Sequence, residues 1–228
     1  GVQTIADPTT TDLGRNPELL ADVSRKAGLA IICCTGLYST ATYLRLRHRL
    51  GGPEAVTDLF VRELTQGIGD TGIRAGFIKA VSMAPAIGRD DHELLLAAAR
   101  ASVITGAPIM THTDGVLGDE QQQILTSAGV PAGSIMIGHS CSSTRFAYHE
   151  RILRGGSYLG FDQLGMETVL PDEMRADSLL KLMHAGWIDH LLVSHDSVWH
   201  WVGGPRMGAG IHKNWKPTNF FERIIPML

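Results

Sequence analysis

Short apolar runs alternate with longer amphipathic stretches along the whole chain. The runs are continuous rather than alternating, which is typical of parallel strands that are buried on both faces. The predicted strands are Val2–Ala6, Ala30–Cys34, Ala75–Val81, Pro108–Thr111, Ile135–Gly138, Tyr158–Phe161 and Leu191–Ser194. The stretches between them have the length and periodicity of helices and cover residues 17–27, 54–69, 91–105, 119–128, 143–154, 173–185 and 218–225.

Successive βα units of this kind predict an α/β fold, and two architectures share the pattern: a doubly wound sheet and a (β/α)8 barrel. A dinucleotide-binding doubly wound sheet carries a Gly-rich turn after its first strand, whereas the first strand here is followed by DPTTTDLGR. The sequence therefore favours a (β/α)8 TIM-type barrel. A barrel has eight units and the pattern shows seven, and the chain starts abruptly in the first apolar run and stops at FFERIIPML, still within an apolar pattern. We therefore expect a single domain over residues 1–228 that lacks the first strand and the C-terminal end of the barrel.

Composition excludes several classes of partner. The chain has 20 basic and 23 acidic residues, a net charge of −3, and no basic stripe, so we expect no nucleic acid partner. No apolar run approaches the ~20 residues that span a bilayer, and the first residues lack the pattern of a signal peptide, so we expect no membrane association. Cys33 and Cys34 are adjacent and Cys141 is the third cysteine, which favours a reduced, cytoplasmic setting. A nucleophilic role for Cys141 would require a lowered pKa.

Polar residues stand at or near the ends of four predicted strands. Lys79 lies inside the third run, His112 follows the fourth, His139 follows the fifth, and His195 and Asp196 follow the seventh. Each residue type has an ordinary structural explanation: a lysine that pairs with a carboxylate, a hydrogen-bonded histidine, or an aspartate that caps the next helix. Together at one barrel mouth, where active sites lie, such groups are expensive to bury unless they are paired or bind metal. Histidine and aspartate are ligands that suit zinc and similar ions.

Several segments also carry a family resemblance, in a consistent order and over most of the chain. They are GVQTIADPTTTDLGR, CTGLYSTATY, DTGIRAGFIKA, TGAPIMTHT, GVPAGSIMIGHS, GSYLGFDQLGMETVLPDEMR and HLLVSHD. The chain resembles the phosphotriesterase-like branch of the amidohydrolase superfamily, which includes the phosphotriesterase-like lactonases.

This resemblance implies a hydrolase of lactones, carboxylic esters or phosphotriesters that acts through a metal-bound hydroxide. It implies two divalent metal ions, zinc or else cobalt, manganese or iron, which are bridged by a carbamate that carbon dioxide forms on Lys79. His112 and His139 correspond to ligands of the more exposed ion. Asp196 corresponds to a ligand of the more buried ion and to the catalytic proton acceptor, and Tyr38 to an active-site tyrosine that is both catalytic and substrate-binding.

The chain departs from the family pattern in two places. No His-x-His pair is present, although the family's first strand carries one for the buried ion, so the alternative is a catalytically impaired or inert barrel that serves as an interaction protein. Gln163 stands where many lactonase-like members have Arg. A third hypothesis is Schiff-base chemistry by Lys79, as in barrel aldolases, but two histidines and an aspartate at metal-ligand positions argue against it.

The expected substrate is a small-molecule ester or lactone, and we expect a homodimer. Gln163 is predicted to contact the substrate, and Trp199 and Trp201, in the glycine-containing segment after Asp196, are predicted to give the substrate an apolar lining. The alternative is that these tryptophans pack on the barrel or on a partner subunit. Four further histidines, away from the strand ends, are expected to be surface or packing residues; they are His48, His92, His149 and His184.

Overall fold

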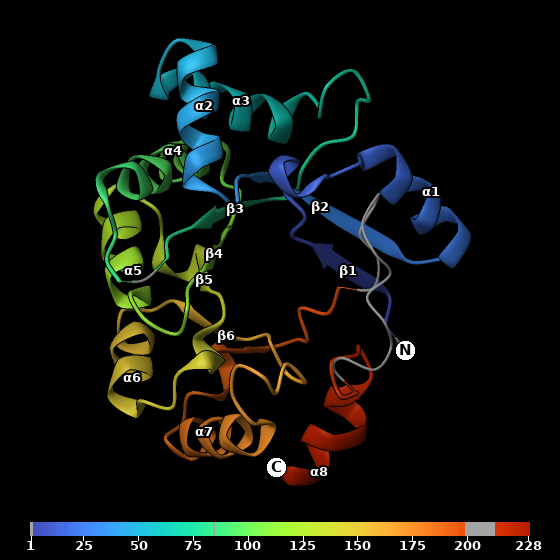
Figure 1. The fold of residues 1–228 in the computed structure, drawn as a ribbon, viewed down its shortest axis with the longest axis vertical. Coiled ribbons are helices and arrows are strands. Elements are labelled where there is room, and N and C mark those ends of the chain that lie inside the picture. Colours follow the sequence, from blue (N-terminus) through green and yellow to red (C-terminus); the bar gives the residue numbers. More distant parts are fainter. Residues whose placement is uncertain (1, 84, 199–212) are drawn as a thin grey trace. The chain divides into compact units, whose positions relative to one another are not determined.

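Parallel strands alternate with helices throughout the part of the chain that the structure describes (Figure 1). The computed structural model describes residues 2–83, 85–198 and 213–228. All the predicted strands are confirmed, with ends that agree within two residues. They are β1 (Thr4–Asp7), β2 (Ala30–Gly36), β3 (Phe77–Val81), β4 (Ile109–His112), β5 (Ile135–Ile137), β6 (Tyr158–Phe161) and β7 (Leu191–Val193).

The predicted helices are also present, and one further helix was not predicted. They are α1 (Pro17–Ala27), α2 (Thr40–Leu50), α3 (Pro53–Thr65), α4 (Arg89–Thr105), α5 (Gly118–Ser127), α6 (Phe146–Arg154), α7 (Asp172–His184) and α8 (Ile225–Met227), which a π-helical turn over Phe220–Ile224 precedes. The helix predicted over residues 54–69 ends earlier, at Thr65, because Gly67 and Gly69 have positive φ angles that end the helix.

Helix α2 was not predicted because leucine and arginine alternate along its second half, and an apolar residue at every second position is typical of a strand. Local signals at its ends nevertheless make it a helix. The Ser39 hydroxyl accepts a hydrogen bond from the Thr42 amide at the N-terminus, and Gly51 closes the C-terminus with a φ of 94°. Such caps satisfy backbone groups that a helix end leaves unpaired.

The chain divides into two compact units. The first comprises residues 1–112 and 123–135, and its strands follow the order β1-β2-β3-β4, each parallel to the next. The second comprises residues 113–122 and 136–228 and contains most of β5, followed by β6 and β7, again parallel and in chain order. The register aligns Gly36 with Lys79 and Val81 with His112 in the first unit, and Phe161 with Val193 in the second.

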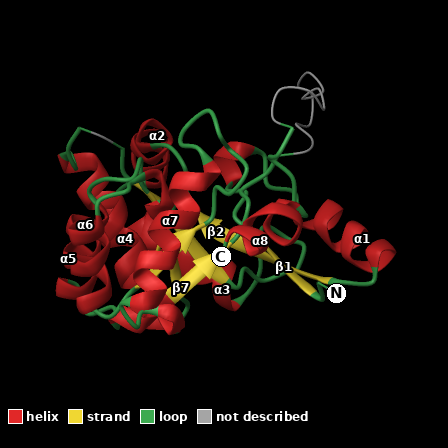
Figure 2. Ribbon diagram, turned by 90° about the horizontal axis from the view of Figure 1, so that it is seen from below, coloured by secondary structure: helices red, strands yellow, loops and turns green. Residues whose placement is uncertain are grey.

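Burial differs among the strands. Every residue of β3 is buried, and α4 packs against β3 and β4 while α3 packs against β2 and α4. In the second unit α6 packs against β6 and α7 (Figure 2). The prediction of burial on both faces is confirmed for β3 but is wrong for β1, whose Ile5 is 45% exposed. Among the described residues β1 forms strand pairs with β2 alone and is an edge strand. No helix among the described residues combines the length and the apolar character that crossing a membrane requires.

A buried ion pair anchors the end of β2 in the first unit. Arg15, in the loop after β1, forms two hydrogen bonds with the Glu63 carboxylate of α3, at 2.7 and 2.8 Å, and its side chain is 4% exposed. Arg15 also donates to the Cys34 carbonyl, at 2.6 Å, and the Thr35 hydroxyl donates to Glu63. This network ties α3 and the β1 loop to the point where the chain leaves β2 toward Tyr38.

We expect the Glu63→Gln substitution to lower the free energy of unfolding by about 3–5 kcal/mol, because it leaves the buried Arg15 guanidinium without its counter-charge. Urea unfolding of the variant measures this loss. The control is Lys26→Met, which removes the exposed Lys26–Asp22 pair and should leave stability nearly unchanged. Equal stability of wild type and Glu63→Gln would show that the pair does not hold the fold.

Candidate metal centre

Lys79 and His112, two predicted metal ligands, lie in the first unit. Lys79 is 4% exposed, and its amine donates to the Thr111 carbonyl at 2.9 Å, one residue before His112 at the end of β4. The backbone of Lys79 is fixed by Gly36, whose φ is 105° and at which a Cβ atom would lie 1.9 Å from the Lys79 carbonyl oxygen. Glycine is therefore required at position 36 for β2 to pass this close to Lys79.

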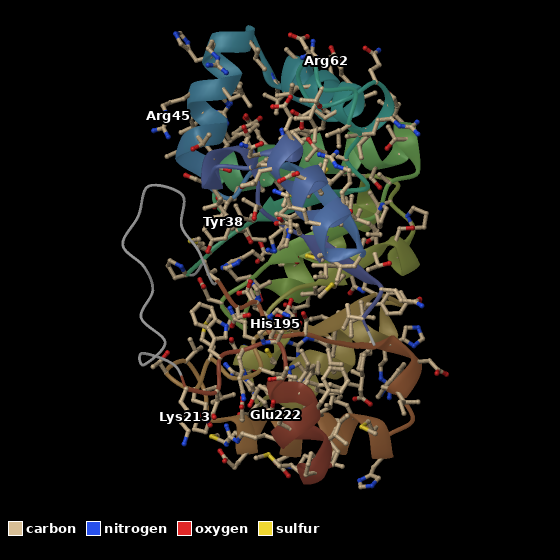
Figure 3. The ribbon with its side chains drawn as sticks, turned by 90° about the vertical axis from the view of Figure 1, so that its right-hand side faces the viewer. Tyr38, Arg45, Arg62, His195, Lys213 and Glu222 are labelled. Atoms are coloured by element: carbon tan, nitrogen blue, oxygen red, sulfur yellow. The ribbon has the colours of Figure 1, made fainter. Side chains whose placement is uncertain are left out.

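The ring of Tyr38, the predicted active-site tyrosine, lies beside the ring of His112, a predicted metal ligand. The two rings meet edge to face, with centroids 5.0 Å apart and an interplanar angle of 81°. The Tyr38 amide donates to the Asp12 carboxylate at 3.0 Å, which fixes the start of the segment after β2 (Figure 3). The first unit thus places a phenol next to one predicted ligand, His112, while Lys79 lies on the neighbouring strand.

His139, the third predicted ligand, is held by a residue that sequence reasoning did not single out. One carboxylate oxygen of Asp162, Oδ1, accepts from the His139 amide at 2.8 Å and lies 3.0 Å from His139 Nδ1. His139 has a φ of 56°, which is uncommon for a residue other than glycine. The signal for Asp162 was its place directly after β6, in the same FDQ segment that drew attention to Gln163.

Asp196 lies close to His139 in the second unit. Its Oδ2 atom is 3.9 Å from His139 Nε2, the ring nitrogen opposite the one that faces Asp162. The Gln163 amide donates to the same Asp196 oxygen at 3.3 Å, and the Ser142 hydroxyl donates to the Gln163 carbonyl oxygen at 2.8 Å. The Ser142 bond fixes the orientation in which Gln163 presents its NH2 group to Asp196.

The hydrogen bonds of His195 hold the local chain at the end of β7. His195 Nδ1 accepts from the Ser197 amide at 3.0 Å, and the His195 carbonyl accepts from the Trp215 indole at 2.8 Å. Burial lowers the pKa of His195, against the opposing effect of Asp196, which favours the neutral imidazole. The predicted substrate contacts Trp199 and Trp201 lie outside the described residues.

The donor set of the second unit suits a divalent ion. Metal-bound histidines usually pass their other ring nitrogen to a carboxylate, which fixes the tautomer, and His139 has this arrangement with Asp162. A separation of 3.9 Å between His139 Nε2 and Asp196 is compatible with two ligands of one ion. Among residues 2–83, 85–198 and 213–228, no three or more His, Cys, Asp or Glu side chains come together as a group that could hold a metal ion, so His139 and Asp196 form a pair of candidate ligands and not a complete set.

Two buried residues lie close to His139 in the chain or through a hydrogen bond to its turn. Burial raises the pKa of the Cys141 thiol to about 12, so Cys141 is not an activated nucleophile at pH 7. His149 of α6 is fully buried and lies 2.9 Å from the Ser140 carbonyl through Nε2. The expectation of a packing or surface role fits its burial, but the sequence held no sign of its hydrogen bond to the turn that carries His139.

We expect stability to fall below pH 6.5 through His149. Burial is the main cause that lowers the pKa of His149 in the folded protein; the hydrogen bond to the Ser140 carbonyl opposes it, and nearby Arg145 adds to it. As pH falls below the ordinary value of about 6.5, the unfolded chain therefore binds a proton before the folded chain does, and stability is lost until the folded pKa is reached. Each pKa unit between the two states corresponds to about 1.4 kcal/mol.

The measurement is urea unfolding at a series of pH values from 8 to 5 for wild type and His149→Gln, which cannot titrate. The difference between the two should grow smaller as pH falls, because only wild type loses this contribution. Parallel pH curves would contradict a lowered pKa for His149.

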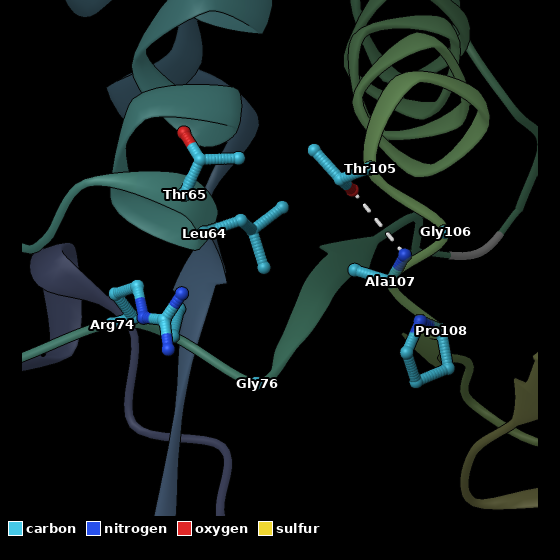
Figure 4. Close-up of a pocket in the computed structure, with 9 residues that line it drawn as sticks. Leu64, Thr65, Arg74, Gly76, Thr105, Gly106, Ala107 and Pro108 are labelled. Atoms are coloured by element: carbon cyan, nitrogen blue, oxygen red, sulfur yellow. Dashed lines mark hydrogen bonds between the residues drawn. The ribbon is translucent and has the colours of Figure 1, made fainter.

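A surface pocket of the first unit lies away from these residues. Its volume is about 440 Å³, and it lies where the chain enters β3 and β4, at the opposite end of β4 from His112 (Figure 4). Backbone and short side chains line most of it, with Arg74 as its charged group; the lining residues are Leu64, Thr65, Arg74, Ala75, Gly76, Thr105, Gly106, Ala107 and Pro108. The pocket therefore takes no part in the candidate centre.

Comparison with known proteins decides the family. The family model described as "Phosphotriesterase family" matches residues 1–228. The chain belongs to the phosphotriesterase family. A "Phosphotriesterase homology protein" of Mycobacterium tuberculosis is 35% identical over 100% of this chain and 73% of its own length. An "Aryldialkylphosphatase" of Saccharolobus solfataricus is 33% identical over 100% of this chain and 74% of its own length.

Solved structures agree with this membership. A variant of a PTE-like lactonase from Deinococcus radiodurans superimposes with a TM-score of 0.91 at 40% identity, over 98% of this chain and 74% of that one. A second structure, from the engineering of organophosphate hydrolysis activity in a weak promiscuous lactonase template, reaches a TM-score of 0.93 at 38% identity, over 99% of this chain and 74% of that one. These matches confirm the TIM-barrel fold class, and the family makes this chain a metal-dependent hydrolase of the amidohydrolase type.

Proposed function

We propose that this phosphotriesterase-family chain hydrolyses lactones or related carboxylic esters, with at most slow turnover of phosphotriesters. The proposed centre contains two divalent ions, zinc or else cobalt, manganese or iron. Their proposed ligands are Lys79, as a carbamate, and His112, His139 and Asp196. The relatives support ester hydrolysis in general, since one bears the name aryldialkylphosphatase and another is a PTE-like lactonase.

The observation that supports this proposal most is the arrangement around His139. Asp162 holds one ring nitrogen of His139, and Asp196 stands 3.9 Å from the other. An imidazole that is backed by a carboxylate and faces another carboxylate is a donor pair that suits a zinc-type ion. An inert barrel needs no such arrangement, and the family match does not favour that alternative.

The bound ions would supply Lewis-acid activation of water and of the carbonyl group. The protein's own groups would do the rest. Asp196 accepts the proton of the attacking water. Gln163 positions this carboxylate, because its amide donates a hydrogen bond to the Oδ2 atom. The hydroxyl of Tyr38, whose ring lies against His112, donates to the oxygen that becomes negative in the tetrahedral intermediate.

The test is an activity panel of five- and six-membered lactones, aryl acetates and a diethyl aryl phosphate, assayed with added Zn²⁺ or Co²⁺. We expect kcat/KM to be highest for a lactone or a carboxylic ester and activity to disappear after chelation. The matched control is protein that has been chelated and then reloaded, which should recover activity. If metal-loaded protein turns over none of these substrates, the inert-barrel alternative replaces this proposal.

A further inference from the structure

The turn that carries His139 rests on a buried histidine. His149 projects from α6 to the Ser140 carbonyl, and both residues have an exposed fraction of 0%. In the described part of the molecule, Nδ1 of His149 is buried without a hydrogen bond. A carbonyl oxygen can only accept a hydrogen bond, so Nε2 carries a proton and donates a hydrogen bond to the Ser140 carbonyl. Nδ1 has no acceptor for a second proton and burial lowers the pKa of the ring, which together favour the neutral Nε2–H tautomer.

His149 also touches the strand end that supports the other side of His139. Its ring lies 5.6 Å from the Phe161 ring, and Phe161 directly precedes Asp162. Asp162 accepts from both the amide and the ring of His139. His149 thus contacts both supports of His139: the turn that follows it, through Ser140, and the end of β6, through Phe161.

The backbone of His139 needs such support. Its φ of 56° is a conformation that costs free energy for a residue with a Cβ atom, and it persists only where surrounding contacts hold it. The Ser140 carbonyl accepts from the Ser143 amide at 3.2 Å and lies 2.9 Å from His149 Nε2. The histidine bond is the shorter of the two and comes from outside the turn.

We propose that His149 is a positioning residue for His139, which holds the strained turn through Ser140 and keeps the His139 imidazole aligned on Asp162. The proposal rests on the proposed function insofar as His139 is a metal ligand. His149 itself contacts neither metal nor substrate in this assignment. An apolar residue of similar size would fill the space but would leave the Ser140 carbonyl with a weaker set of partners.

The experiment compares three variants. His149→Leu removes the donor, His149→Gln keeps an NH2 donor on a flexible side chain, and Leu153→Ala loosens the same helix without touching a hydrogen bond, since Leu153 is an aliphatic residue that is 2% exposed. Two readouts are taken: the zinc dissociation constant by competition with a chelator, and the hydrogen-exchange rate of the His139 Nδ1–H proton in metal-free protein by NMR. Global stability from urea unfolding is recorded for each.

We expect His149→Leu to weaken zinc binding by at least about 10-fold, the lower scale for residues that orient metal ligands, and to speed His139 exchange beyond what its stability loss explains. Most of both effects should be restored in His149→Gln, and Leu153→Ala should change them only in proportion to its stability. If His149→Leu matches Leu153→Ala at equal stability in both readouts, the proposal is overturned. If wild type binds no zinc, the proposed function fails, and the exchange rates alone decide the role of His149.

Discussion

Replacing Asp196 by Asn should lower kcat/KM by at least about 100-fold in metal-loaded protein, since the substitution removes the proposed proton acceptor and weakens a proposed ligand. Asparagine is suited to this test because Asp196 has a φ of 48°, a conformation that asparagine tolerates as well as aspartate does. The fold around position 196 should therefore survive, and unfolding should occur at nearly the wild-type urea concentration. Steady-state assays on the best substrate of the panel give the measurement.

The control for charge is Asp177→Asn, which removes an exposed carboxylate of α7 that pairs with Lys181. It should keep wild-type kcat/KM. Metal content separates the two roles of Asp196. A variant that keeps its metal and loses kcat has lost the proton acceptor, whereas a variant that loses its metal has lost a ligand. Full activity of Asp196→Asn would contradict both.

The strands could be predicted because their signal is local. A continuous apolar run such as Phe77–Val81 is selected by burial on both faces, and that burial is present in β3. Burial of β1 could not be inferred in the same way, because exposure depends on which strands flank it and not on its own residues. Helix α2 was missed for a related reason: its alternating leucines and arginines resemble a strand, while its caps at Ser39 and Gly51 decide for a helix.

The candidate centre divides along the same line. Lys79, His112, His139 and Asp196 stand out because they recur at or near the ends of several apolar runs and because the family resemblance gives each of them a role as a ligand. Their supports do not stand out. Asp162 looks like any aspartate after a strand, and His149 looks like the other histidines in helices. His149 differs from the other histidines because α6 packs so that its side chain reaches the Ser140 carbonyl. No short sequence motif marks that packing.

Gln163 shows how a departure from the family pattern acquires a physical meaning. The sequence predicted a substrate contact that differs from the usual Arg, and this remains a prediction. The structure adds that the Gln163 amide spans Ser142 and Asp196. A neutral amide at this position donates to the carboxylate without the charge that an Arg would bring, so the environment of Asp196 differs from that beside an Arg in the same place.

Replacing Lys79 by Met should remove most of the metal and lower kcat/KM by at least about 100-fold while the fold is retained. Lys79 is buried within an all-buried strand, and its amine has the Thr111 carbonyl as a partner. Met has a similar length and needs no partner, so the variant should unfold at the same or a higher urea concentration than wild type. Residues that hydrogen-bond to a metal ligand contribute about 10–100-fold to metal affinity or activity, and loss of the bridging anion itself should cost more than that.

Two comparisons make this result specific to a carbamate. The first is Lys181→Met, which removes an exposed amine from α7 and should keep wild-type metal content and activity. The second is reconstitution of metal-free wild type with zinc in buffer with and without bicarbonate, because a carbamate forms from carbon dioxide and a neutral amine. Bicarbonate should speed the recovery of activity in wild type and have no effect on Lys79→Met. Recovery that is independent of bicarbonate, together with a Lys79→Met variant that keeps its metal, would show that Lys79 packs in the strand without bridging ions.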